Sequence, residues 1–406
     1  MARVARSEIF EPDEVAIVHV MNRTVRGCFL LGNDPATGRN YDHRKDWMDQ
    51  QLTTQAQYFA IDLLTQAILD NHFHLVLRSR PDMVREWDDE EVARRWLMIC
   101  PSQRDELGLP VPPTPREFKK LIKDKKKLAD VRTRLSDISW WMKLLTQNIA
   151  QRANKEEGQA GSFWQGRFKA VRILDEATLL ACCVYVDLNP IRAAMAETIE
   201  GSRYSAVQKR FLDEKDEFEI QRSAQAAERE AAEQDFRVAV DTAVDASPEE
   251  QWQMEQTLQA AADGIGPAAR TTGPQTTCAR RRSRHLAPIE LRDGPGAKTG
   301  PCPNLTGDRC SDKGFLSMTT AEYLSLVDWT ARQLDPKKRG ATPDNIAPLF
   351  ERLGIAEDVW CEIARNFRRL FSVVAGQPQT IDNHRSSGRR RRYYVPPQTL
   401  DLMAKV

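Results

Sequence analysis

Residues 71–78 read Asn-His-Phe-His-Leu-Val-Leu-Arg, and the first half of the chain is organised around this stretch. Apolar residues lie on both sides of the histidines, which predicts a buried β-strand. Side chains at positions i and i+2 of a strand point to the same face, so His72 and His74 project together and Phe73 points to the opposite face. Two neighbouring imidazoles can form half of a metal site, or they can simply line one face of a sheet. The rest of the chain has to decide between these alternatives.

The surrounding segments predict an α+β fold. Apolar runs, helical spacing and turn residues place the elements in this order: a strand at 15–20, a helix at 42–59, strands at 61–69 and 72–77, a helix at 136–155 capped by Ser136, a strand at 162–173 and a helix at 176–195. The dipeptide Asp70-Asn71 suits a tight turn between the second and third strands. Without the helical insertion at 81–135, this order is close to the split βαβ, ferredoxin-like pattern.

The remainder of the chain divides by composition. We expect a first domain over 8–210, followed by a charged, low-complexity linker over 211–315. Amphipathic spacing returns in 316–376 and predicts a small all-α module, and 377–406 is a basic tail containing four arginines at 389–392. The insertion carries a run of lysines within 119–127, which is either a solvated helix face or a contact for nucleic acid.

The overall composition does not exclude a nucleic-acid partner. The chain has 406 residues with 41% hydrophobic and 29% charged residues, and its formal net charge is only +1. Basic and acidic clusters alternate, so local fields matter more than the sum. The first residues lack the apolar core of a signal peptide and no run is long enough to span a membrane, so we expect a cytoplasmic protein.

The eight cysteines include no CxxC pair. A zinc site could be drawn from Cys278, His285, Cys302 and Cys310, but their spacing is irregular and they lie in a region rich in Pro, Gly and Arg. Free, reduced thiols are the interpretation that we prefer.

Tyr185 and Asn189 give the histidine pair a chemical context. They are four residues apart, so they share one face of the predicted helix. A tyrosine hydroxyl attacks phosphorus only when the phosphate is polarised and held in line, which a divalent cation on two imidazoles can do. Asn189 offers a carboxamide oxygen as a third ligand. The structural alternatives are a core aromatic for Tyr185 and a helix C-terminal residue ahead of Pro190 for Asn189.

Three motifs together resemble a known family. His72-Phe73-His74 resembles the HUH motif of single-strand DNA nucleases and transposases, and His19 with Met21-Asn22-Arg23 resembles the opening strand of the REP-associated tyrosine transposases. The segments Phe163-Trp164-Gln165-Gly166-Arg167-Phe168 and Tyr185-Val186-Asp187-Leu188-Asn189-Pro190-Ile191-Arg192-Ala193 are similar to the signature of the REP-associated tyrosine transposases. The resemblance covers roughly residues 8–210. One departure is Asp70-Asn71, where family members often carry Pro-Asn before the first histidine.

The resemblance implies a mechanism and a set of partners. Tyr185 would cleave single-stranded DNA beside imperfect palindromic hairpins and form a 5′-phosphotyrosine link, with Mg²⁺ or Mn²⁺ held by His72, His74 and Asn189. A monomer and a homodimer both remain open. The alternatives are a domesticated hairpin-binding protein without transposition activity and a plain structural metal or RNA-binding protein. The candidates for DNA contact are Arg23, Arg26, Arg167, Lys169 and Arg172.

Overall fold

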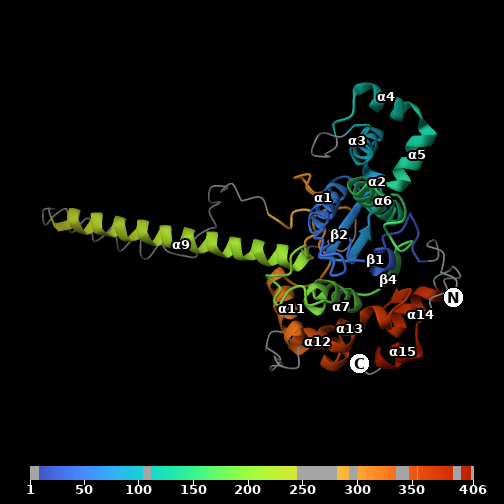
Figure 1. Cartoon of the computed structure of the whole chain (residues 1–406). Helices are drawn as coiled ribbons and strands as arrows, with labels where there is room; N and C mark the ends of the chain where they lie inside the picture. The colour runs from blue at the N-terminus through green and yellow to red at the C-terminus, as the bar shows by residue number, and fades with distance from the viewer. Residues whose placement is uncertain are drawn as a thin grey trace. The chain divides into compact units, whose positions relative to one another are not determined.

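A mixed sheet forms the centre of the computed structural model, which describes residues 9–103, 111–244, 281–291, 300–334, 347–353, 355–386 and 395–403. Within these ranges the strands are β1 (Ile17–Arg23), β2 (Ile61–Ile68), β3 (His72–Ser79), β4 (Lys169–Ile173) and β5 (Val374–Ala375). Their order in the sheet is β2-β3-β1-β4-β5 (Figure 1). Pairs β2/β3, β1/β3 and β1/β4 are antiparallel, whereas β4/β5 is parallel. The fold is α+β.

The turn between β2 and β3 is held by contacts outside the strands. The Lys45 ammonium lies 2.5 Å from the Asp70 carboxylate, and the backbone N–H of Leu31 donates to the Asp70 carbonyl at 2.8 Å. A Cβ atom at Gly32 would lie 2.0 Å from the Asp70 carboxylate, so only glycine fits beside this turn. Asp70 therefore fixes the start of β3 and the position of the histidines on it.

Two long helices cover one face of the sheet. They are α1 (His43–Tyr58) and α6 (Ile138–Glu157), which pack on a core that includes Val18, Val20 and Phe73. Asp137, not Ser136, caps α6, because its carboxylate accepts a hydrogen bond from the Ser139 N–H at 2.6 Å. The helix ends at Glu157, and Gly158 follows as its C-cap with φ at 61°.

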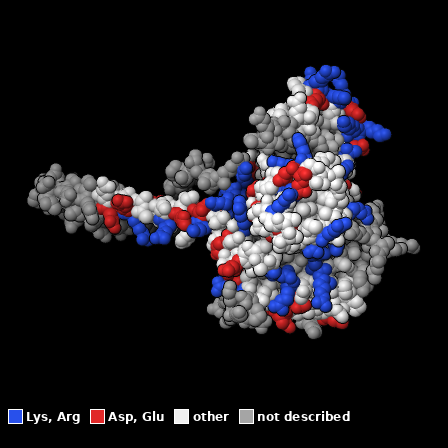
Figure 2. Space-filling model, in the orientation of Figure 1, with Lys and Arg blue, Asp and Glu red and all other residues white. Residues whose placement is uncertain are grey.

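The insertion is helical. Its helices are α2 (Pro81–Glu86), α3 (Asp89–Ile99), α4 (Pro115–Lys123) and α5 (Lys125–Arg134). Thr114 and Glu117 form a capping box at the start of α4, and the Asp88 carboxylate caps α3. The predicted lysine run lies on α4 and α5, where Figure 2 shows a group of Lys and Arg side chains.

The opposite face of the sheet is covered by α7 (Glu176–Asp187), which is buried along nearly its whole length. Helix α7 contacts β2 and β3 on one side and α11 (Thr320–Leu334) and α13 (Glu357–Leu370) on the other (Figure 1). Further helices near the C-terminus are α12 (Ala347–Leu353), α14 (Pro378–Ser386) and α15 (Pro397–Met403). The predicted all-α module thus packs directly on the helix that carries Tyr185.

Two compact units make up the chain. The first combines Met1–Phe211 with Ser283–Val406, so the C-terminal helices and the sheet belong together, and β5 extends the sheet beyond β4. The second is Leu212–Arg282, and it contains most of α9 (Ala206–Val244). The segment predicted as a linker therefore includes a long helix. The last residues of this segment, from Ser283 onward, belong to the first unit.

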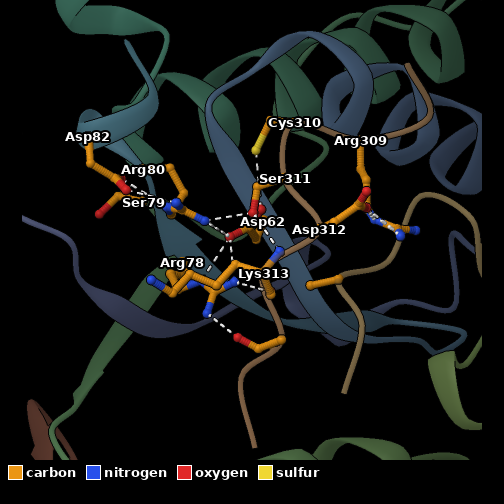
Figure 3. Close-up of polar contacts among 12 residues, drawn as sticks. Asp62, Arg78, Ser79, Arg80, Asp82, Arg309, Cys310, Ser311, Asp312 and Lys313 are labelled. Atoms are coloured by element: carbon orange, nitrogen blue, oxygen red, sulfur yellow. Dashed lines mark hydrogen bonds and ion pairs between the residues drawn. The ribbon is translucent and has the colours of Figure 1, made fainter. Parts of the chain in front are cut away.

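A buried polar network ties residues 300–316 to the sheet, at the end of β3 away from the histidines (Figure 3). The Asp62 carboxylate lies 2.7 Å from the Arg78 guanidinium and 3.2 Å from the Arg80 guanidinium, and it accepts the Cys310 thiol at 3.1 Å. Arg80 also donates to the Ser311 hydroxyl at 2.6 Å.

No helix in the described ranges is long and apolar enough to cross a bilayer.

Candidate active site

Three histidines gather on the face of the sheet that α7 covers. His72 and His74 share β3, and their ring centroids are 5.1 Å apart. His19 of β1 stacks on His74 with centroids 5.1 Å apart, and its Nε2 lies 2.9 Å from His74 Nδ1. From sequence, His19 was expected in the opening strand without a role in the site. The sequence signal for its position is the alternation of side chains along β1, which puts His19 and Met21 on the same face of the sheet.

All three imidazoles are neutral at pH 7. Burial, followed by the charges of Arg23 and Arg368, lowers the pKa of His72 to about 4. Burial lowers the pKa of His19 to about 3, and the pKa of His74 falls well below its ordinary value for the same reason. His72 Nδ1 donates to the Asn71 side-chain oxygen at 2.6 Å, because that oxygen can only accept. This bond leaves the Nε2 lone pair of His72 available.

The structure brings Tyr185 to the histidines across more than a hundred residues of sequence. Its ring centroid lies 5.6 Å from that of His74 and 6.0 Å from that of His19. The Arg192 guanidinium lies 5.1 Å from the Tyr185 ring centroid. Burial raises the pKa of the Tyr185 hydroxyl, while the charges of Arg368 and Arg192 act in the opposite direction. The two arginines therefore favour the phenolate that burial disfavours.

Asn189 stays beside Tyr185 although the predicted helix is interrupted. Helix α7 ends at Asp187, and the short helix α8 (Asn189–Arg192) follows, so the helix predicted to continue to 195 ends early. The Asn189 side-chain N–H donates to the Tyr185 carbonyl at 2.9 Å. The carboxamide oxygen of Asn189 is then left as an acceptor.

Phe367 of α13 covers the site, and this contact was not predicted from the sequence. Its ring centroid lies 5.8 Å from that of Tyr185 and 5.8 Å from that of His19. Tyr185 is only 6% exposed as a result. An amphipathic helix does not reveal from its own sequence which partner its apolar face meets, so no sequence signal linked Phe367 to the histidines.

The residues present fit a divalent metal ion by their chemistry. Two neutral imidazoles and one carboxamide oxygen are a mixed nitrogen and oxygen donor set, which Mn²⁺ accepts and Mg²⁺ accepts less readily. The Asn71 contact orients His72 in the way that hydrogen bonds orient many metal-bound imidazoles. The described residues contain no group of three or more His, Cys, Asp or Glu that could hold a metal. Asn189 remains the expected third protein ligand beside His72 and His74.

The alternative zinc site does not form in the described part of the chain. Cys278 lies outside the described residues. Cys310 is buried and bound to Asp62, whereas Cys302 is exposed. Cys28, Cys182 and Cys183 of the described residues carry thiols and lie far from this region of the sequence.

Three of the five predicted DNA-contact residues line one cavity. Arg23, Arg167 and Lys169 surround a space of about 220 Å³, and Arg368 of α13 completes its wall. Figure 2 shows Lys and Arg side chains gathered over the region of β4 and α13. Arg368 was not among the predicted residues.

The other two predicted residues lie elsewhere. Arg26 is exposed in the 3-10 turn η2 (Val25–Gly27), with φ at 53°. Arg172 is buried, and its guanidinium pairs with the Glu14 carboxylate and donates to the Ile9 carbonyl at 3.4 Å. The prediction that Arg172 contacts DNA is corrected, because this guanidinium is buried and forms an ion pair within the protein.

A second, more open cavity of about 520 Å³ adjoins the first and shares Asn22, Gly166 and Arg167 with it. Its walls include the aromatic side chains of Trp140, Trp164 and Phe168. An aromatic wall beside a cationic wall is the combination that binds single-stranded nucleic acid through bases and phosphates.

Comparison with known proteins gives little for this chain. No family model and no curated protein matches it. A solved structure of a REP-associated tyrosine transposase bound to a REP hairpin is similar over 51% of this chain and 82% of that chain, with 10% sequence identity and a TM-score of 0.28. At that TM-score the similarity carries no argument, and the proposals below rest on the residues of this chain.

Proposed function

We propose that the chain is a single-tyrosine HUH transposase of the REP-associated type, which cleaves and rejoins single-stranded DNA at hairpin-forming sequences. One observation carries this proposal: the Tyr185 ring lies 5.6 Å from His74, whose neighbour on the same strand face is His72. A nucleophile and two neutral imidazoles thus meet at one place, although a strand and a distant helix supply them.

The arrangement of the sheet supports the same assignment. We assign β1 to β4 to the split βαβ, ferredoxin-like pattern, with α1 and α6 as the two helices that pack on one face of the sheet. The order β2-β3-β1-β4 with antiparallel neighbours agrees with that pattern. On this scaffold the two central strands carry all three histidines.

The proposed reaction is a phosphoryl transfer to tyrosine. The Tyr185 oxygen attacks a backbone phosphorus, the bond from phosphorus to the 3′ oxygen breaks, and a 5′-phosphotyrosine forms. The phenolic proton leaves Tyr185 and the departing 3′ oxygen takes up a proton, so the step is proton-neutral overall. Attack by the 3′-hydroxyl of a second strand reverses the step and joins new ends without ATP.

The chain's own residues hold and orient the reactants. His72, His74 and Asn189 would hold Mg²⁺ or Mn²⁺, which when bound polarises the scissile phosphate. Arg192 lies over the Tyr185 ring and favours its ionised form. Asn189 binds the Tyr185 carbonyl and so fixes the end of α7 that presents the nucleophile.

A second candidate function is a DNA-hairpin-binding protein that no longer moves DNA. The burial of Tyr185 under Phe367 favours it, because a covered nucleophile does not reach a phosphate unless α13 shifts. The two functions differ in one product, which is the covalent protein–DNA adduct.

The test is an adduct assay with single-stranded hairpin oligonucleotides in Mg²⁺ or Mn²⁺. We expect the full-length protein to form an adduct that resists denaturing electrophoresis, and we expect Tyr185→Phe to form none while still binding the hairpin. Tyr323→Phe is the matched control, because Tyr323 is also a buried tyrosine but its hydroxyl donates to Asp187 at 2.5 Å. An adduct that survives in Tyr185→Phe overturns the enzyme, and binding without any adduct in the wild type selects the binding protein.

A further inference from the structure

The cavity beside the histidines has an unusual wall. Its charged lining residues are Arg23 at the end of β1, Arg167 just before β4, Lys169 at the start of β4, and Arg368 on α13. Among the residues that the structure describes, no Asp or Glu side chain lines it. Four cationic side chains thus surround a space of about 220 Å³, which favours an anionic occupant.

The position of the cavity links it to the candidate active site. Arg23 is the direct partner of His72 in the β1/β3 pair, and Met21 is the partner of both His74 and Lys169. Arg368 directly follows Phe367, whose ring contacts Tyr185. The charge of Arg368 lowers the pKa of His19, His72 and His74.

A structural role does not account for Arg368. The side chain is half-buried, and among the described residues its guanidinium has no ion pair or hydrogen bond. Arg172 shows the contrast, because its buried guanidinium is paired with Glu14. A guanidinium that points into a cationic cavity without a carboxylate lacks the partner that arginines of the interior have.

We infer that this cavity binds a phosphate of the single-stranded DNA backbone and that Arg368 of α13 completes it. Arginine suits the task because its planar fork donates two parallel hydrogen bonds to phosphate oxygens. The C-terminal helices then contribute directly to substrate binding. The inference rests on the proposed function for the identity of the phosphate as a DNA backbone phosphate.

The test compares two neighbouring arginines of one helix. Arg368→Gln removes the charge in the cavity, and Arg369→Gln removes the next charge, which is exposed on α13 and does not line the cavity. Fluorescence anisotropy with a labelled single-stranded hairpin oligonucleotide, at several salt concentrations, measures affinity and its salt dependence. We expect Arg368→Gln to weaken binding about tenfold and to reduce the slope of log affinity against log salt by about one. We expect Arg369→Gln to change neither.

Further variants and outcomes keep the inference separate from the proposed function. Arg368→Lys retains the charge, so it should keep the salt slope of the wild type, and its unfolding midpoint shows whether position 368 tolerates change. If the wild type binds DNA and forms the adduct while Arg368→Gln behaves as Arg369→Gln, this inference fails and the proposed function stands. If Arg368→Gln loses affinity but the wild type forms no adduct, the binding site stands and the enzyme fails. If the wild type does not bind the oligonucleotide, both fail.

Discussion

At the scale of single residues, the buried carboxylate of Asp62 holds two guanidinium groups. Arg78 and Arg80 lie within ion-pair distance of it, and all three side chains are nearly inaccessible (Figure 3). Asp62→Asn leaves buried Arg78 without its counter-charge and Arg80 with Asp82 alone, so we expect the free energy of unfolding to fall by about 3–5 kcal/mol. Urea unfolding followed by tryptophan fluorescence measures the change.

Asp328→Asn is the matched control for that prediction. Asp328 pairs with Arg332 at 2.5 Å on the surface of α11, and both side chains are largely exposed. Exposed pairs contribute little, so we expect a change within about 0.5 kcal/mol. Equal losses in the two variants would contradict the assignment of the Asp62 network as a tie between the sheet and residues 300–316.

Residues of the candidate site could be predicted from sequence only where the local backbone determines which way their side chains point. Strand alternation placed His72 and His74 on one face, and the four-residue spacing placed Tyr185 beside Asn189. Phe367 and Arg368 could not be named, because their contacts depend on how a distant helix packs. Arg172 was misassigned because a basic residue in a strand gives no sign of whether a carboxylate such as that of Glu14 lies beside it.

At the scale of elements, Phe367 is one of the buried side chains that pack α13 on α7. Phe367 is fully buried and its ring contacts those of Tyr185, His19 and Phe371. Phe367→Ala leaves a cavity between two helices and the sheet, and we expect a loss of about 3–5 kcal/mol in the free energy of unfolding. Urea unfolding followed by tryptophan fluorescence checks this value.

The same chemical change at an exposed site provides the comparison. Phe218 is 65% exposed on α9, so Phe218→Ala should alter the unfolding transition by no more than about 0.5 kcal/mol. If Phe367→Ala proves equally mild, α13 is not anchored through this ring, and its role in covering Tyr185 is wrong.

Elements with strong local signals were predicted best. The strands at 61–69 and 72–77 and the helices at 42–59 and 136–155 correspond closely to β2, β3, α1 and α6. The strand predicted at 162–173 is shorter, because β4 begins at Lys169 and the preceding residues make only an isolated bridge from Trp164 to Thr24. β5 had no sequence signal, since a two-residue strand is defined by its partner alone.

At the scale of the whole molecule, His285 couples stability to pH. It is buried, and its neighbouring charged groups are Asp49 of α1, Lys209 and Arg210 of α9, and Arg309. Burial, followed by the charge of Lys209, lowers the pKa of His285 to about 3. The unfolded chain binds the proton near pH 6.5, so the contribution to stability is complete above that pH and is lost as the pH falls toward 3.

Comparison with His285→Gln isolates this contribution from the other histidines. Between pH 6.5 and pH 4 we expect wild-type stability to fall more steeply than that of the variant, by up to about 1.4 kcal/mol per pH unit. Urea unfolding at a series of pH values gives the two slopes. Parallel slopes would mean that His285 is protonated in the folded protein.

The parallel pairing of β4 with β5 also has a consequence for biosynthesis. The first 211 residues contain the three histidines, Tyr185 and Asn189, but the sheet lacks its last strand until residue 375 has been made. At about 5–20 residues per second, that interval lasts on the order of ten to thirty seconds. During this time the nascent chain has neither the aromatic cover over Tyr185 nor the fourth cation of the neighbouring cavity. Packing of α13 therefore supplies the cover over Tyr185 and the fourth cation of the cavity together.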